Sequence, residues 1–437
     1  MFPSPPIFTI PDDLMYDILV DVCKDDDTRP LELSLVCKRW RNAVLDASIL
    51  WSNIEFNSPP PYHIQERRLQ RSKSAPLTIT ILPQFQSGMG MRAIASIIKL
   101  LRPHVHRFRS LDIGYMKRKG VRTFFDELGR FKAPILTNLT VRAPVDSKKW
   151  TLKPFGGHAT GLLTLHIAWG RTNWHPSLLC NLTSLSLAVS SWNSSWNITL
   201  FDILKILTQT PCLKTLGLQF RRNAIQTGEP WNSSPVKLEF LSAIHFSTLI
   251  HTFNTMEPWM LSLLCAIIAP NLRSFPCNIH PPCIMTLNDC ATFPLPGLRD
   301  LQMMPDPDGV NISRDSFPAF LKNVHQLERL CVIGDQLTKP AIQHLSTQLN
   351  YLKVLLIRGN PLSLEGLKNL VVARINNPDL SALKTLMMGR TYYQEKNWPS
   401  DLEVEWFKAH VDDFQCDLQG HQVGVEVLPV ASRVYMT

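Results

Sequence analysis

The sequence predicts an α/β fold in which a short all-helical module precedes a curved solenoid of repeats, each contributing one strand and one helix. The first observation is an apolar-x-x-apolar-x-apolar spacing that recurs along most of the 437 residues. The second is a set of segments between these copies that are apolar at three- and four-residue spacing, as amphipathic helices are. The third is that residues 9–54 do not fit the repeat and therefore form a separate part of the chain.

The repeat is clearest in the middle apolar residue of each copy. These residues are Leu111, Leu139, Leu165, Leu185, Leu216, Leu241, Phe275, Leu301, Leu330, Leu355 and Leu386. Neighbouring ones are mostly 25 to 31 residues apart, which is close to the period of leucine-rich repeats, about 20–29 residues. One strand and one helix cannot bury an apolar face alone, so the repeats must stack. The alternative is a doubly wound sheet, but the continuous Val/Ile strands and Gly-rich phosphate loop expected there are missing from the sequence.

The N-terminal module is predicted to contain helices that begin near Pro11 and Leu31. Asp12 and Asp13 follow Pro11, and a proline with acidic neighbours favours a helix N-terminus. The second helix is expected to extend to about Ala47. Some 45 residues bury too little surface to be stable alone, so an exposed apolar stripe of the module is expected to contact a partner.

Composition divides the chain into four parts. We expect the helical module at residues 5–56, a polar, proline-containing linker at 57–75, the solenoid at 76–390 and a C-terminal cap at 391–437. The cap is predicted to hold a helix over 402–414 and a strand over 423–428, and to cover the last repeat.

The overall composition, 45% hydrophobic and 19% charged, is that of a globular protein. The first ten residues lack Lys and Arg, and the longest apolar stretch, residues 259–269, is far shorter than the roughly 20 residues of a membrane helix. Ten scattered cysteines suggest reduced thiols, hence a cytoplasmic and/or nuclear protein without a membrane partner. The net charge of +9 is spread along the chain, so we expect no nucleic-acid partner.

Three runs of the module match a known pattern. They are Ile10-Pro11-Asp12-Asp13-Leu14, Leu35-Val36-Cys37-Lys38-Arg39-Trp40 and Leu50-Trp51. Together they resemble an F-box, in which a Leu-Pro opening precedes Leu-Val-Cys-Lys-Arg-Trp and then Leu-Trp. Ile10 replaces the opening leucine, and the acidic joint at residues 24–28 is longer than usual. An F-box followed by irregular leucine-rich repeats is similar to the large F-box families of fungi.

This resemblance implies a non-catalytic substrate-recognition subunit of an SCF-type ubiquitin ligase. In the family, the F-box binds a Skp-family adaptor, which connects to a cullin scaffold and a RING subunit. The residues that the resemblance places in or behind this contact are Pro11, Leu14, Ile18, Val36, Cys37, Trp40, Leu50 and Trp51. Two alternatives are that these residues merely cap the solenoid, and that the protein is a leucine-rich-repeat scaffold unrelated to ubiquitin.

The target protein is expected to bind the concave face of the repeats. Side chains alternate along a strand, so the residues between the buried leucines face the other side of the sheet. We expect contacts from Asp112, Arg142, His166, Gln219, Gln302, Arg329 and Arg358. Basic residues at the strand entrance form a predicted rim that either steers an acidic target or is simply a solvated edge. They are Arg109, Lys214, Arg273, Arg299, Lys353 and Lys384.

Catalytic motifs are not evident. Cys277, His280, Cys283 and Cys290 are ligand types that suit zinc, but their spacing is unlike that of a standard finger. The sequence has no P-loop, nucleophile elbow or H-E-x-x-H motif. We therefore expect no enzyme activity, cofactor or metal. A metal-dependent enzyme built around these four residues is the remaining alternative.

Overall fold

The computed structural model divides into two compact units, Met1–Leu182 and Thr183–Thr437. It describes residues 10–23, 29–82, 90–114, 116, 118–142, 154–168, 178–189, 198–220, 225–226, 234–248, 258–276, 297–302, 321–322, 324–333, 337–358, 363–389 and 399–417. The four candidate zinc ligands, the acidic joint at 24–28 and the predicted strand at 423–428 lie outside these residues.

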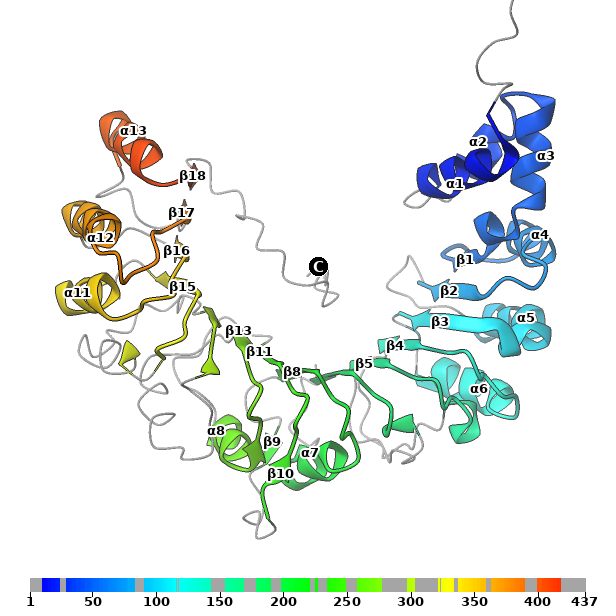
Figure 1. Cartoon of the computed structure of the whole chain (residues 1–437). Helices are drawn as coiled ribbons and strands as arrows, with labels where there is room; N and C mark the ends of the chain where they lie inside the picture. The colour runs from blue at the N-terminus through cyan, green and yellow to red at the C-terminus, as the bar shows by residue number, and fades with distance from the viewer. Residues whose placement is uncertain are drawn as a thin grey trace, which may run out of the picture. The chain divides into compact units, whose positions relative to one another are not determined.

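The first unit begins with short helices and continues as a parallel sheet (Figure 1). Its helices are α1 (Asp12–Val22), α2 (Arg29–Leu33), α3 (Lys38–Asp46), η2 (Ser48–Trp51), α4 (His63–Arg71), α5 (Met91–Leu101), η3 (Arg102–Arg107), α6 (Arg118–Leu128) and η4 (Pro154–Gly157). Its strands are β1 (Asn53–Phe56), β2 (Leu77–Ile81), β3 (Phe108–Ile113), β4 (Asn138–Arg142) and β5 (Thr164–Ala168), in that order across the sheet.

The second unit holds nine further strands of the same parallel type. Their order is β6 (Ser184–Val189), β8 (Thr215–Phe220), β11 (Ala243–Thr248), β13 (Ser274–Pro276), β14 (Asp300–Gln302), β15 (Arg329–Ile333), β16 (Val354–Arg358), β17 (Thr385–Gly389) and β18 (Asp413–Asp417). The described helices are α7 (Leu200–Leu207), α8 (Pro258–Cys265), α11 (Lys339–Thr347), α12 (Leu364–Asn376) and α13 (Asp401–His410). Two small ladders join β7 (Ile198–Thr199) to β9 (Ile225–Gln226) and β10 (Val236–Lys237) to β12 (Ile267–Ile268).

The register confirms the repeat template. In the first unit Ile79, Leu111, Leu139 and Leu165 are neighbours across the sheet, and all four are buried. Within each unit the labelled helices lie along one side of the strands (Figure 1). The leucines of the repeat are buried. Both units are mixed α/β and consistent with a leucine-rich-repeat-type solenoid.

One copy of the repeat was placed in the wrong register. Leu216 pairs with Ile244, so the middle residue of that copy is Ile244 and its first residue is Leu241. Phe246 then completes the copy, and all three side chains are buried. The sequence pattern was ambiguous here because Leu238 precedes Leu241 at the same three-residue spacing. Strand pairing resolves the ambiguity, since a parallel ladder aligns equivalent residues.

The expected boundaries differ from the observed ones at both ends. The expected linker at 57–75 contains α4, whose Leu69 is buried together with Tyr62. Residues 53–56, expected to belong to the all-helical module, form strand β1, which pairs with β2 and begins the sheet. The expected second helix of the module is divided into α2 and α3 by a turn at residues 34–36. In the expected cap, α13 and β18 form one more strand-and-helix pair, because β18 pairs with β17 in parallel.

The thiol expectation does not hold for every cysteine. Cys37 and Cys212 carry free thiols, whereas Cys265, at the end of α8, is disulfide-bonded. In the part of the chain that the structure describes, no helix is long and apolar enough to cross a membrane.

Candidate protein-interaction surfaces

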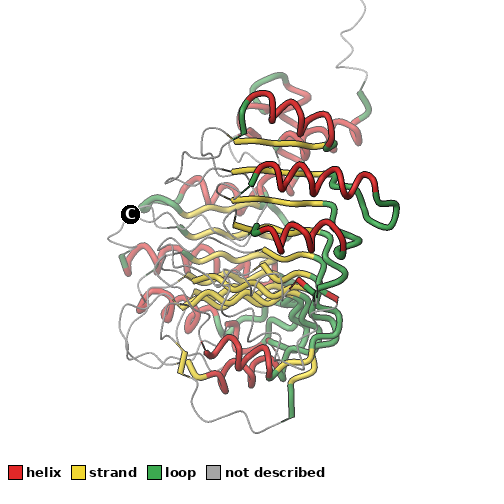
Figure 2. Tube along the Cα trace, turned by 90° about the vertical axis from the view of Figure 1, so that its left-hand side faces the viewer, coloured by secondary structure: helices red, strands yellow, loops and turns green. Residues whose placement is uncertain are grey.

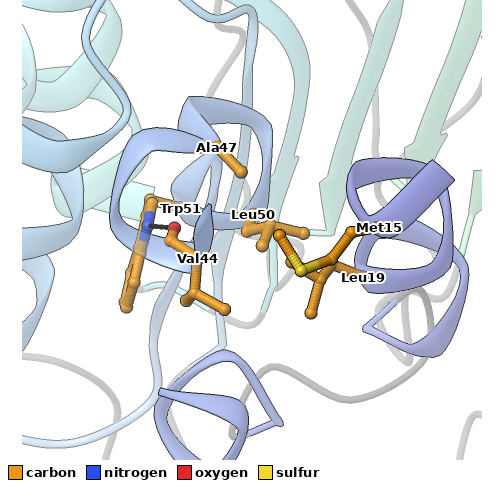
Figure 3. Packing of buried hydrophobic residues seen from close by; sticks show 6 residues of the cluster. All are labelled: Met15, Leu19, Val44, Ala47, Leu50 and Trp51. Atoms are coloured by element: carbon orange, nitrogen blue, oxygen red, sulfur yellow. Dashed lines mark hydrogen bonds between the residues drawn. The ribbon is translucent and has the colours of Figure 1, made fainter. Parts of the chain in front are cut away.

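The N-terminal helices have a small core of their own. It consists of Met15 and Leu19 from α1, Val44 from α3, and Ala47, Leu50 and Trp51 at and after the end of α3 (Figure 3). The Trp51 ring is 1% exposed, and its indole N–H donates to the Val44 carbonyl at 2.9 Å. The hydrogen bond satisfies the only polar atom of this side chain, so the ring can be buried without cost to its donor. Leu14 and Ile18, which the resemblance places at the adaptor contact, lie outside this core, and Met15 and Leu19 are the residues of α1 within it.

Helix α4 fastens this core to the first strand of the same unit. The Arg71 guanidinium lies 4.5 Å from the centroid of the Trp51 ring, which is a cation–π distance. The neighbouring Arg68 donates to the carbonyl of Asn53, in β1, at 2.8 Å. The buried Arg107, the last residue of η3, donates to two residues that follow α4: the Ser72 hydroxyl at 2.7 Å and the Ala75 carbonyl at 2.8 Å. The helical module is therefore packed onto the sheet rather than tethered by a linker.

The outer side of α1 is apolar and exposed. Leu14 and Ile18 are 55% and 43% exposed, and Val22 continues the same stripe one turn later. Residues four apart lie on one face of a helix, so these three form a continuous stripe. A contiguous exposed apolar stripe is a feature of surfaces that bind a partner.

A second apolar group lies on the turn between α2 and α3. Leu35 and Val36 are both exposed, Val36 by 57%. Arg39, three residues later, donates to the Asp12 carboxylate at 2.6 Å and to the Ile10 carbonyl, so the start of α3 lies beside the start of α1. The turn therefore lies at the same end of the module as Pro11 and Leu14.

The predicted adaptor-contact residues thus fall into three groups. Pro11, Leu14, Ile18 and Val36 are exposed, while Cys37 and Trp40 are half-buried. Leu50 and Trp51 are core residues and can support a contact only from behind. Sequence reasoning missed Leu31 and Leu35 as exposed apolar residues. Leu35 lies on the turn at residues 34–36, where we expected one continuous helix, so its exposure could not be predicted from helical spacing.

On the face of the first unit's sheet that the alternation of side chains predicts for target binding, three predicted target-contact residues lie close together. Asp112 and His166 flank Thr140 on neighbouring strands, and the Arg142 guanidinium donates to the Asp112 carboxylate at 3.1 Å. Burial raises the pKa of Asp112, and the Arg142 charge and hydrogen bond oppose that shift. Burial, with a smaller effect of Arg142, lowers the pKa of His166 to about 4. One carboxylate oxygen of Asp112 is buried and has no hydrogen-bond partner among the described residues.

The lowered pKa of His166 makes acid unfolding a test of this geometry. Between pH 6.5 and 4 the unfolded chain binds a proton at this residue that the folded chain does not, so stability is present above pH 6.5 and is lost as pH falls. At pH 5 the loss is about 2 kcal/mol. We expect His166→Gln to lose less stability between pH 7 and pH 5 than wild type, measured by urea midpoints. The exposed His158→Gln is the control, and equal pH dependence of both variants would contradict the assignment.

On the corresponding face of the second unit's sheet, the predicted residues are more dispersed. Gln219 lies in β8, Gln302 in β14, Arg329 in β15 and Arg358 in β16. Arg329 is beside Asp300 in the register, and its charge opposes the rise that burial causes in the pKa of Asp300. Sequence reasoning did not predict that Arg329 and Asp300 are adjacent, because the two residues are far apart along the chain.

A histidine that we did not select lies on the same face. His245 is beside Gly217 in the register, and a Cβ at Gly217 would lie 3.1 Å from the Ser186 hydroxyl oxygen. The Nε2 atom of His245 is buried and has no hydrogen-bond partner among the described residues. Burial lowers the pKa of this histidine. Toward β16 the face becomes apolar, and both Cys331 and Leu356 are buried.

No group of three or more His, Cys, Asp or Glu side chains in the described part of the chain is arranged to hold a metal ion. The chain matches no protein-family model and no curated protein. Among solved structures it is similar to a leucine-rich-repeat protein of Leptospira interrogans, with 14% sequence identity over 82% of this chain and 100% of that chain, and a TM-score of 0.28. The solenoid assignment therefore rests on the strands and register of this chain.

Proposed function

We propose that this protein is the substrate-recognition subunit of an SCF-type ubiquitin ligase, in the cytoplasm or nucleus. Its N-terminal helices would bind a Skp-family adaptor, and through it a cullin–RING ligase. Its repeats would bind a target protein and hold it near the ubiquitin-conjugating enzyme. Such a subunit acts by raising the effective concentration of the target, so no residue of this chain takes part in the chemistry.

The exposed apolar side chains of the N-terminal module carry the proposal. Leu14 and Ile18 on α1 and Val36 on the turn before α3 point away from the module's own core. Leu14 and Val36 belong to the runs that resemble an F-box, in which the corresponding residues contact the adaptor, and Ile18 lies one turn after Leu14 on the same face of α1. Fully burying a leucine or valine contributes about 1.5–3 kcal/mol, so these side chains are candidates for the residues that dominate adaptor binding.

The packing of the module onto the sheet supports the same proposal. A ligase receptor has to hold its target at a defined distance from the ligase, and a flexible linker would blur that distance. Here Arg68, Arg71 and Arg107 fix the module, α4 and the first strands of the unit to one another. The target-binding repeats of the first unit are therefore joined rigidly to the adaptor-binding helices.

The proposal is tested by co-purification of the full chain with the host's Skp-family adaptor. We expect Leu14→Asp combined with Val36→Asp to weaken adaptor binding at least about 100-fold, because each change places a charge in an apolar contact. Both side chains are exposed, so the fold should be preserved and the circular dichroism spectrum unchanged. Point variants are preferable to deletion of residues 1–56, since that deletion would remove β1 from the sheet.

A matched control changes two exposed apolar residues of the second unit, Phe201→Asp with Leu402→Asp. This variant should bind the adaptor within about threefold of wild type. If wild-type protein does not retain the adaptor, the ubiquitin-ligase proposal is wrong. The chain is then better described as a leucine-rich-repeat scaffold unrelated to ubiquitin.

A further inference from the structure

The second unit carries a row of basic side chains along the edge where the strands begin. Seven residues, each immediately before one of seven successive strands, are joined by backbone hydrogen bonds of 2.8–2.9 Å, each N–H after the first donating to the carbonyl of the previous member. In order they are Lys214, Ser242, Arg273, Arg299, Glu328, Lys353 and Lys384, which we call the basic row. The connections that lead into the strands form one edge of the sheet (Figure 2).

The repeat itself creates this alignment. Each member of the basic row directly follows the first buried leucine of its copy, such as Leu272 before Arg273 and Leu383 before Lys384. Because side chains alternate along an extended chain, burial of the leucine directs the next side chain away from the core. Lys214, Arg273, Arg299 and Lys384 are accordingly exposed, and Lys353 is half-buried.

The charges of the row are only partly neutralised. Glu328 is its one acidic member, and its carboxylate lies 3.1 Å from the Arg299 guanidinium and 3.9 Å from the Lys353 ammonium. Lys214, Arg273 and Lys384 form no ion pair with any residue that the structure describes. Within these seven residues five cations share one anion, and their mutual repulsion favours an anionic ligand. The ladder continues past Lys384 to the acidic Asp413, whose N–H donates to the Lys384 carbonyl at 2.9 Å, so the basic stretch ends there.

We propose that the basic row binds an extended acidic segment of a protein, rich in Asp and Glu. Neighbouring strands are about 4.8 Å apart, so six steps from Lys214 to Lys384 span about 29 Å. An extended peptide rises about 3.3 Å per residue, so roughly nine residues match this length. The N–H groups of the row already bond within the sheet, so its side chains provide recognition.

The composition of the row favours a peptide over a nucleic acid. Single-stranded nucleic acids are bound by aromatic side chains that stack on bases, and the row has no aromatic member. A continuous phosphate backbone would also pass beside Glu328, which repels it. A peptide avoids this cost by placing a neutral or basic residue opposite Glu328.

The acidic segment would be part of the target protein in the proposed function, and only this identification of the segment as a ligase target rests on the proposed function. The test is fluorescence anisotropy of the full chain with a labelled ten-residue Glu/Ser peptide and no adaptor, so its failure is distinguishable from failure of adaptor binding. We expect binding that weakens from 50 to 200 mM salt, because exposed charges are screened. A ten-residue oligothymidylate should bind more weakly than the peptide.

Three variants sharpen the test. Changing Arg273, Arg299 and Lys384 to Glu should weaken peptide binding at least tenfold. The control changes the exposed helical residues Lys99, Lys205 and Lys339 to Glu, alters net charge equally, and should bind within about twofold of wild type. Glu328→Gln should bind about threefold more tightly, because Arg299 and Lys353 lose their internal partner. The inference is wrong if wild type does not bind the peptide, if the two triple variants behave alike, or if oligothymidylate binds more tightly.

Discussion

Arg374→Met is expected to lower the free energy of unfolding of the second unit by about 4 kcal/mol. The Arg374 side chain on α12 is 1% exposed and donates to the carbonyls of Leu345, Leu349, Leu352 and Ser381, at 2.7 to 3.0 Å. Each buried carbonyl left without a donor costs about 1–3 kcal/mol, and local relaxation recovers part of this. The effect is therefore larger than that of an ordinary surface change.

The partners of Arg374 explain why this residue has no simple replacement. Leu345 and Leu349 lie at and after the end of α11, where helical carbonyls lack donors, and Leu352 and Ser381 precede β16 and β17. Burial lowers the pKa of Arg374 to about 10, so the guanidinium remains protonated at neutral pH. Only the planar arginine fork offers donors in several fixed directions.

Urea unfolding followed by circular dichroism measures this effect, and hydrogen exchange of residues 345–352 localises it. Arg374→Lys should be intermediate, since lysine keeps the charge but not the fork. Ile375→Met, an exposed neighbour on α12, should change the free energy of unfolding by less than about 0.5 kcal/mol. If Arg374→Met and Ile375→Met have the same urea midpoint, the four hydrogen bonds do not stabilise the fold.

Trp51→Ala is expected to unfold the N-terminal helices locally and so to abolish adaptor binding. Removing a fully buried tryptophan costs about 3–5 kcal/mol, and this one also loses its bond to the Val44 carbonyl and its contact with Arg71. The module has a core of only six buried side chains, so little stability remains to offset the loss. The solenoid should remain folded, because its leucines pack separately from this core.

Hydrogen exchange of residues 10–52 is the direct measurement for Trp51→Ala. Trp40→Ala is the matched control, since Trp40 lies in the same module but is only half-buried. It should retain most of the protection of α1 and α3 while weakening adaptor binding by about 2 kcal/mol, the scale of an interface hot spot. Equal protection of residues 10–52 in Trp51→Ala and wild type would show that Trp51 does not hold the module together.

Sequence periodicity alone was sufficient to predict the repeat architecture. Buried positions recur at a constant spacing along the chain, and each copy is a local pattern that can be recognised without its neighbours. Leu111, Leu139 and Leu165 were therefore placed correctly, as was the outward direction of Asp112 and His166. The helix start at Pro11 was predicted for the same reason, because proline and acidic residues act on the nearest turn.

Features that depend on contacts between distant residues were decided by the tertiary structure. The sequence by itself determined that the chain consists of a helical module and stacked repeats, since those signals are local. It did not determine that α4 packs on Trp51, that Ile244 replaces Leu241 as a middle residue, or that Arg374 bonds four carbonyls. These outcomes depend on which segments become neighbours, and the free energy of packing, rather than local propensity, selects those neighbours.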